Sequence, residues 1–317
     1  MVIGVGLGLL IYQISLQPGA AMVKAVFEGG SEVTPPPDFA DRSKHVAETR
    51  HVPVTADGVP PATMNIVTPT AGGQPRAMIL WIHGGGFISS SSDTVRDYMV
   101  MLASDGYVAA SLDYSLAPDA GYPTPVLQAN AALAQLRRDA DGYGGDPSRI
   151  FIGGDSAGAQ IAGELAAAQS NPELAASLDM LPALTTSDLR GVILFCGLYD
   201  MRTVGASGFP ALRTYLWAYT GTREWVDFPR IDELSTTGQA TTAFPPTFLT
   251  VGDRDPFAAQ AEELAVQLRG ANVPVTTLFW TGTGAGLDHE YQFNFTLPQA
   301  QLAYTATLRF LNEEGDD

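Results

Sequence analysis

A serine flanked by glycines stands in the pentapeptide Gly154-Asp155-Ser156-Ala157-Gly158. The apolar residues 150–152 before it predict a strand, and the alanine-rich residues 157–169 after it predict a helix. A G-x-S-x-G sequence between a strand and a helix forms a sharp turn that exposes the serine hydroxyl above the sheet. The pattern therefore favours a nucleophilic serine, with a glycine-rich turn needed only for packing as the alternative.

Three consecutive glycines after another apolar run offer a second element of the same chemistry. The segment His83-Gly84-Gly85-Gly86-Phe87 directly follows residues 77–82, whose apolar character predicts a strand buried on both faces. Glycines at the end of such a strand leave backbone N–H groups uncovered, and each donor of this kind contributes about 3 kcal/mol to oxyanion stabilisation. A phosphate-binding loop is the competing interpretation, but its G-x-x-x-x-G-K-[ST] pattern is absent.

A nucleophilic serine needs a base, and the sequence has four histidines. His45 and His51 precede the core of the predicted sheet, and His83 belongs to the glycine loop. His289 follows the last predicted strand in a glycine-rich loop, which is expected to reach the sheet edge that carries Ser156. By elimination and by position, His289 is the predicted base.

The acid that would orient this base is open between two aspartates. Asp253 and Asp255 both follow the predicted strand 248–251. Asp255 precedes Pro256, so its structural alternative is to cap the next helix. Asp253 has the alternative of a turn residue beside Arg254.

Alternating strands and helices position these residues. Two short strands, 51–55 and 63–68, are joined by an Asp57-Gly58 turn, which predicts an antiparallel hairpin at the sheet edge. Strands are then predicted at 77–82, 107–112, 150–152, 192–196, 248–251 and 275–280, and helices at 94–104, 126–137, 157–169, 257–268 and 299–311. The alternation predicts an α/β fold with a mostly parallel, doubly wound sheet of about eight strands.

Two segments fall outside this alternation. Residues 1–40, which contain Pro35-Pro36-Pro37, are expected to form an N-terminal segment before an α/β domain of residues 41–317. Residues 1–23 carry no charge but are apolar over fewer than the ~20 residues of a spanning helix. A membrane-proximal segment and a helix near the site both stay open. An aromatic-rich insertion at about 198–244 predicts a small helical cap, with a purely structural excursion as the alternative.

Composition limits the partners. The chain has 317 residues and a formal charge of −17, which would repel nucleic acid and anionic lipid headgroups. A neutral or cationic small molecule is the better expectation. The single cysteine, Cys196, ends an apolar run and is interpreted as a small buried side chain rather than a reactive thiol.

Five motifs in this order and spacing resemble the hormone-sensitive-lipase-like family of bacterial esterases. They are His83 to Phe87, Asp113-Tyr114-Ser115-Leu116-Ala117-Pro118, Gly154 to Gly158, Asp255-Pro256-Phe257 and the late His289, and the resemblance covers residues 75 to 312. It implies the α/β-hydrolase fold, Ser156 as nucleophile, and Asp255 rather than Asp253 as the third triad member with His289. It also implies an oxyanion hole from the N–H groups of Gly85, Gly86 and Ala157, with His83 structural.

The chain departs from the family pattern at three places. Ser115 stands where arginine is common, Ala159 stands where a second glycine is usual, and residues 289–291 read His-Glu-Tyr instead of His-Gly-Phe. None of these departures removes a residue of the expected triad. They leave the subfamily and the substrate undetermined.

The resemblance implies a carboxylesterase that acts through an acyl-enzyme, with no metal or organic cofactor. The aromatic-rich insertion predicts an apolar pocket that favours short- to medium-chain esters. An amidase or peptidase with the same triad is the first alternative, and a non-catalytic ligand-binding protein of this fold is the second. The expected partner is a small-molecule ester, and the assembly is a monomer or a homodimer. A cytoplasmic and a membrane-associated location both remain open.

Overall fold

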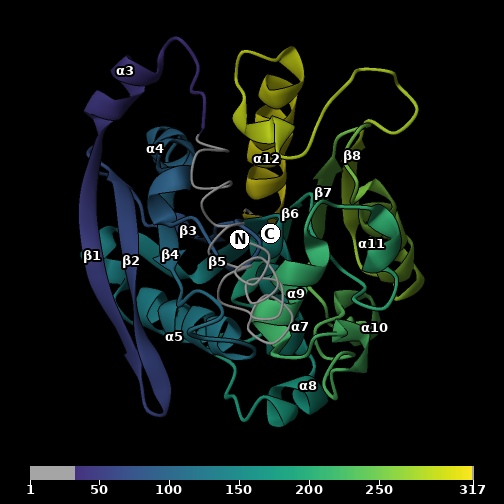
Figure 1. The fold of residues 1–317 in the computed structure, drawn as a ribbon. Helices are drawn as coiled ribbons and strands as arrows, with labels where there is room; N and C mark the ends of the chain where they lie inside the picture. The colour runs from purple at the N-terminus through teal and green to yellow at the C-terminus, as the bar shows by residue number, and fades with distance from the viewer. Residues whose placement is uncertain (1–32, 316–317) are drawn as a thin grey trace, which may run out of the picture.

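The computed structural model describes residues 33–315 and is built around an eight-stranded sheet (Figure 1). The strand order is β1-β2-β4-β3-β5-β6-β7-β8, in which β2 is antiparallel to β1 and β4 and the other neighbouring pairs are parallel. The predicted fold class, edge hairpin and strand number are therefore confirmed. The strands are β1 (Val46–Ala56), β2 (Val59–Pro69), β3 (Arg76–Ile82), β4 (Val108–Asp113), β5 (Gly145–Asp155), β6 (Leu189–Phe195), β7 (Thr247–Val251) and β8 (Val275–Phe279).

Helices cover both faces of the sheet, with α4 and α12 on one face and α5 and α7 on the other (Figure 1). All residues of α7 are buried, because its alanines and glycines let it pack between the sheet and neighbouring helices. The helices are α3 (Phe39–Arg42), α4 (Arg96–Ser104), α5 (Thr124–Arg138), α6 (Ala140–Tyr143), α7 (Ala157–Ser170), α8 (Pro172–Ser177), α9 (Leu212–Thr220), α10 (Thr236–Gln239), α11 (Ala258–Gly270) and α12 (Pro298–Gly315). Short 3-10 turns lie at Ser43–His45, Ser92–Val95, Val204–Ser207, Trp225–Asp227 and Tyr291–Phe293.

The parallel register brings the carboxyl ends of the central strands to one edge. Ile82, the last residue of β3, pairs with Gly154 of β5, and Asp155 pairs with Phe195 at the end of β6. The glycine loop after β3 and the serine turn after β5 consequently begin side by side. The segment after β7, which carries both candidate aspartates, starts at the same edge because β7 pairs in parallel with β6.

The segment between β6 and β7 contains α9, α10 and two 3-10 turns and no strand. Of its aromatic side chains, Phe209 and Tyr215 line the cleft beside Ser156, whereas Tyr199 and Tyr219 are fully buried. This distribution is compatible with the predicted helical cap, but most of the aromatic residues serve packing.

The N-terminal residues that the structure describes are joined to the segment after His289. The Thr34 N–H donates to the Phe293 carbonyl at 2.8 Å, and the Phe295 N–H donates to the Thr34 carbonyl at 2.9 Å. Residues 1–23, for which membrane contact was left open, lie outside the described residues. Among the helices of residues 33–315, none combines the length and apolar character needed to cross a bilayer.

Candidate active site

Ser156 occupies the sharp turn between β5 and α7 with φ of 52° and ψ of −119°. A non-glycine residue in this region costs on the order of 1–3 kcal/mol, so the surrounding packing has to impose it. A Cβ atom on Gly154 would lie 2.5 Å from the Gly158 carbonyl, and one on Gly158 would collide with the Ile82 carbonyl. Both glycines are therefore required for the helix to approach β3 and hold the serine in this conformation.

The structure brings Ser156, His289 and Asp255 together in one hydrogen-bonded row. His289 Nε2 lies 2.9 Å from Ser156 Oγ, and His289 Nδ1 lies 2.9 Å from Asp255 Oδ2. With a proton on Nδ1 facing the carboxylate, Nε2 is free to accept the serine proton. The second oxygen of Asp255 accepts the Phe257 N–H at 2.8 Å, so the carboxylate is held at both ends.

Asp253, the other candidate acid, holds the loop that carries His289. Its carboxylate accepts the N–H groups of Gly286 at 3.0 Å and Leu287 at 2.7 Å, and no hydrogen bond joins it to the imidazole among residues 33–315. The Arg254 N–H also donates to the Leu287 carbonyl at 3.0 Å. These contacts fix the loop two residues before His289, which gives Asp253 a positioning role.

The environment of His289 favours its protonated form. Burial lowers the pKa of His289, but Cys196 and the Asp255 hydrogen bond oppose burial and raise this pKa well above its usual value. Burial raises the pKa of the Cys196 thiol to about 12, so at neutral pH the uncharged thiol acts on His289 only as a hydrogen-bond partner and not as a charge. Asp255 is therefore the one charged group of the hydrogen-bonded row that would stabilise a protonated His289.

The predicted oxyanion donors lie in the loop that shares the cleft with Ser156 and at the residue that directly follows Ser156. Gly85 and Gly86 line the cleft, and Ala157 is the first residue of α7. Their N–H groups donate to no acceptor within residues 33–315. Gly85 has φ of +103° and Gly86 has φ of +59°, and a Cβ on Gly86 would lie 2.5 Å from the Tyr215 ring. The glycines are thus needed both for the backbone conformation and for the space beside Tyr215.

A buried network holds the glycine loop. Asp155 accepts the Trp81 indole N–H and the Gly84 N–H, each at 2.8 Å. The His83 ring stacks on Tyr114 with centroids 4.4 Å apart, and its Nδ1 lies 2.8 Å from the Gly84 carbonyl. His83 is only 1% exposed, which agrees with the structural role that the resemblance implied.

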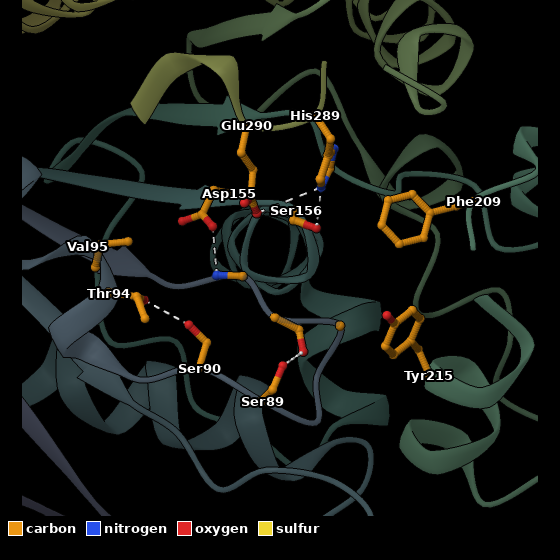
Figure 2. A pocket seen from close by; sticks show the side chains of 13 residues that line it. Ser89, Ser90, Thr94, Val95, Asp155, Ser156, Phe209, Tyr215, His289 and Glu290 are labelled. Atoms are coloured by element: carbon orange, nitrogen blue, oxygen red, sulfur yellow. Dashed lines mark hydrogen bonds and ion pairs between the residues drawn. The ribbon is translucent and has the colours of Figure 1, made fainter. Parts of the chain in front are cut away.

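The cleft has two chemically different sides. Figure 2 shows Phe209 and Tyr215 on one side of Ser156, and Glu290, Asp155 and Thr94 on the other. The aromatic side offers an apolar surface, whereas the opposite side presents carboxylates and hydroxyl groups. An ester whose carbonyl carbon reached Ser156 would extend one substituent towards each side.

One group of three possible metal ligands occurs in the described part of the chain, and it lies within this site. Cys196, Asp255 and His289 have ligand atoms within 4.8 Å of one another. The imidazole and the carboxylate are already hydrogen-bonded to each other, and the thiol is protonated at neutral pH. The donor set therefore fits a hydrogen-bonded triad better than a metal centre.

Several residues of the cleft have no role predicted from the sequence, and two of them, Asp155 and Glu290, carry carboxyl groups. Asp155 was noted only as a letter of the serine motif, and Glu290 only as a departure from the family pattern. Glu290 has φ of +59°, and its Oε1 lies 3.8 Å from His289 Nε2. The signal available in the sequence was the acidic residue directly after the predicted base.

Comparisons with known proteins agree with this architecture. A family model described as alpha/beta hydrolase fold matches residues 79–289, which is more than half of the chain. In the solved structures, the chain is similar to Esterase B from Lactobacillus rhamnosus, with a TM-score of 0.77, 22% identity and coverage of 97% of this chain and 95% of that chain. It is also similar to a bacterial heroin esterase, with a TM-score of 0.71, 24% identity and coverage of 92% and 96%.

Sequence relatives match over shorter segments. Lipase 2 of a Moraxella species is 36% identical over 77 residues, which are 24% of this chain and 18% of the relative. Esterase LipC of Mycobacterium tuberculosis is 31% identical over 81 residues, which are 25% and 20% of the two chains. The chain thus matches only about a fifth of the length of these curated relatives. Together with the family match, these similarities confirm the resemblance drawn from the motifs.

Proposed function

The chain belongs to the alpha/beta hydrolase fold family, and from this membership and the geometry of the cleft we propose that it is a carboxylesterase. The observation that carries the proposal is the row Ser156–His289–Asp255, with both hydrogen bonds at 2.9 Å. The names of the two relatives described above, a lipase and an esterase, support the same reaction class.

The first half of the reaction forms an acyl-enzyme. His289 Nε2 takes the proton of Ser156 as the serine oxygen attacks the ester carbonyl, and Asp255 stabilises the resulting imidazolium. The oxyanion receives hydrogen bonds from N–H groups of Gly85, Gly86 and Ala157, each contributing about 3 kcal/mol. The C–O bond then breaks, and the leaving alcohol takes the proton from Nε2.

The second half repeats these steps with water. His289 takes a proton from a water molecule at the position vacated by the alcohol, and the hydroxide attacks the acyl carbon. The bond between the acyl carbon and Ser156 Oγ then breaks and releases the carboxylic acid, and His289 Nε2 returns the proton to Ser156 Oγ. The protons and bonds of both halves balance with the ester, water and the residues of this chain.

The aromatic wall supports a preference for short to medium esters. Tyr215 is 3% exposed and packs directly against Gly86, and the Phe209 ring lies edge-on to His289 at 5.2 Å. A long acyl chain would have to displace these packed rings. A small apolar group can occupy the space beside them.

The test is hydrolysis of p-nitrophenyl esters from acetate to palmitate by the wild type and by Ser156→Ala. The proposal predicts activity concentrated at short and medium chains, with a loss of at least about 10³-fold in the variant. Activity that survives the substitution would remove Ser156 from the mechanism. Hydrolysis of a matched anilide at the rate of the ester would instead indicate an amidase.

A further inference from the structure

Glu290 directs a buried carboxylate into the cleft. Its side chain is 9% exposed, and among residues 33–315 its ionic partner is His289, whose Nε2 lies 3.8 Å from Glu290 Oε1. Figure 2 shows this carboxylate beside Asp155 and Ser156, on the side of the cleft opposite Phe209 and Tyr215. A carboxylate that lines the cleft beside the imidazole attracts a ligand with a positive charge at this position and repels one with a negative charge.

A second carboxyl group, that of Asp155, lies beside Glu290 on this side of the cleft. A Cβ atom built on Gly84 would lie 2.5 Å from Asp155 Oδ2 and 2.9 Å from Glu290 Oε1, so both oxygens flank the same point of the glycine loop. Burial and then the proximity of Glu290 raise the pKa of Asp155 well above its usual value. Asp155 is held by the Trp81 and Gly84 N–H groups, whereas the ionic partner of Glu290 among the described residues is His289. The residues that line the cleft include no lysine or arginine.

The geometry of proton transfer places the leaving alcohol next to Glu290. To receive its proton, the leaving oxygen must come within about 3 Å of His289 Nε2. Glu290 Oε1 lies 3.8 Å from the same nitrogen. The first few atoms beyond the leaving oxygen are therefore within reach of the Glu290 carboxylate, while the acyl part extends towards the aromatic side.

We propose that Glu290 is a specificity-determining residue and that the enzyme prefers esters whose alcohol part carries an ammonium group a few bonds beyond the ester oxygen. The inference rests on the proposed esterase function. The ammonium group would lie against the Glu290 carboxylate, and an anionic alcohol part would be repelled. The net charge of −17 would add a weaker attraction of cations to the whole surface, which the experiment must separate.

The experiment compares acetylcholine with 3,3-dimethylbutyl acetate, which has the same shape with carbon in place of the charged nitrogen. For the wild type we expect kcat/KM for the cationic ester to exceed that of the neutral ester by roughly 10-fold or more. Glu290→Gln should reduce this ratio to near one. Asp288→Asn removes the same charge from a side chain 73% exposed one residue before His289, and it should keep the ratio.

The outcomes separate this inference from the esterase function. Hydrolysis of p-nitrophenyl acetate by the wild type tests the function, and the ratio of the two matched esters tests the role of Glu290. A wild-type ratio near one, or failure to hydrolyse the choline ester, would overturn the inference and leave the function intact. So would a ratio that survives Glu290→Gln or falls equally in Asp288→Asn.

A measurement on the wild type alone covers the case in which Glu290→Gln does not fold. Choline and 3,3-dimethylbutanol are compared as inhibitors of p-nitrophenyl acetate hydrolysis. The inference predicts roughly 10-fold tighter inhibition by choline, with little change between low and moderate salt because the carboxylate is buried. Equal inhibition by the two alcohols would contradict it.

Discussion

Replacing Asp255 by asparagine removes the charge that faces His289 while keeping the shape of the side chain. One oxygen of Asp255 accepts the Phe257 N–H at 2.8 Å, and the other faces His289 Nδ1 at 2.9 Å. In the variant, the amide oxygen has to stay with the Phe257 N–H, because an amide NH₂ group there would leave two donors facing each other. The NH₂ group is then directed at Nδ1.

This orientation predicts a large and specific loss. An NH₂ group facing His289 Nδ1 requires that nitrogen to be an acceptor, so the proton moves to Nε2 and the ring can no longer accept the proton of Ser156. A histidine held in the wrong tautomer lowers kcat by about 10⁴-fold in serine proteases, or about 5.5 kcal/mol. We expect a loss of this order for Asp255→Asn, with KM for p-nitrophenyl acetate little changed.

Asp253→Asn is the matched control, since the same chemical change occurs two residues earlier. Asp253 contacts two backbone N–H groups of the His289 loop and not the imidazole. An asparagine keeps one acceptor oxygen there, so we expect a decrease in kcat of no more than about 10-fold. Steady-state kinetics, with circular dichroism to confirm folding, compares the two variants.

The reasoning is refuted if Asp253→Asn loses more activity than Asp255→Asn. It is also refuted if Asp255→Asn is folded and retains more than about a tenth of the wild-type kcat. In the first case Asp253 would be the third member of the triad. In the second, the orientation of His289 would not depend on the carboxylate.

Three further predictions follow from the environments of single groups. Burial lowers the pKa of His289, but its partners raise this pKa well above the usual value. Since His289 acts as a base only when neutral, activity should be lost as pH falls, and the acid limb of kcat/KM should lie above pH ~6.5. An acid limb near pH ~5 would contradict this. Burial raises the pKa of Glu164 to about 8, so the native state binds a proton that the unfolded chain, titrating near pH ~4.3, releases. Stability should therefore decrease as pH rises through this window, by on the order of a few kcal/mol, and thermal unfolding of Glu164→Gln should show a clearly smaller decrease. Gly86→Ala places a Cβ atom 2.5 Å from the Tyr215 ring at a residue whose φ is +59°. The displaced N–H group should lower kcat for p-nitrophenyl acetate about 10²-fold. A variant with the wild-type kcat would mean that Gly86 is not an oxyanion donor.

Much of the sheet could be predicted because buried parallel strands are continuous apolar runs. The predicted strands 77–82 and 248–251 correspond closely to β3 and β7. The strand predicted at 150–152 instead begins at Gly145, because its first residues pair with the start of β3 although they include Pro147 and are not apolar. The short helix α8 was missed, since six residues show no periodicity that distinguishes a helix from a loop.

Site residues could be predicted where neighbouring residues in the sequence form a recognisable motif. They could not be predicted where their role depends on contacts between residues that are far apart in the sequence. The turn around Ser156 could be recognised from adjacent residues, and Cys196 is buried as expected. Spacing alone could not choose between Asp253 and Asp255, because both point at the same loop and only the fold shows which one reaches the imidazole. Glu290 gains its meaning from its distance to His289 Nε2, which no local pattern encodes.

The central claim, that Ser156 is the nucleophile activated by His289, is tested most directly by mass spectrometry after reaction with a p-nitrophenyl alkylphosphonate. The reagent loses p-nitrophenolate only to an activated nucleophile and leaves a stable adduct. The account predicts one adduct per chain, on the peptide that contains Ser156, with none in Ser156→Ala and greatly slowed labelling in the His289→Ala variant. An adduct on another residue, or an unlabelled enzyme that is still inactivated, would contradict it.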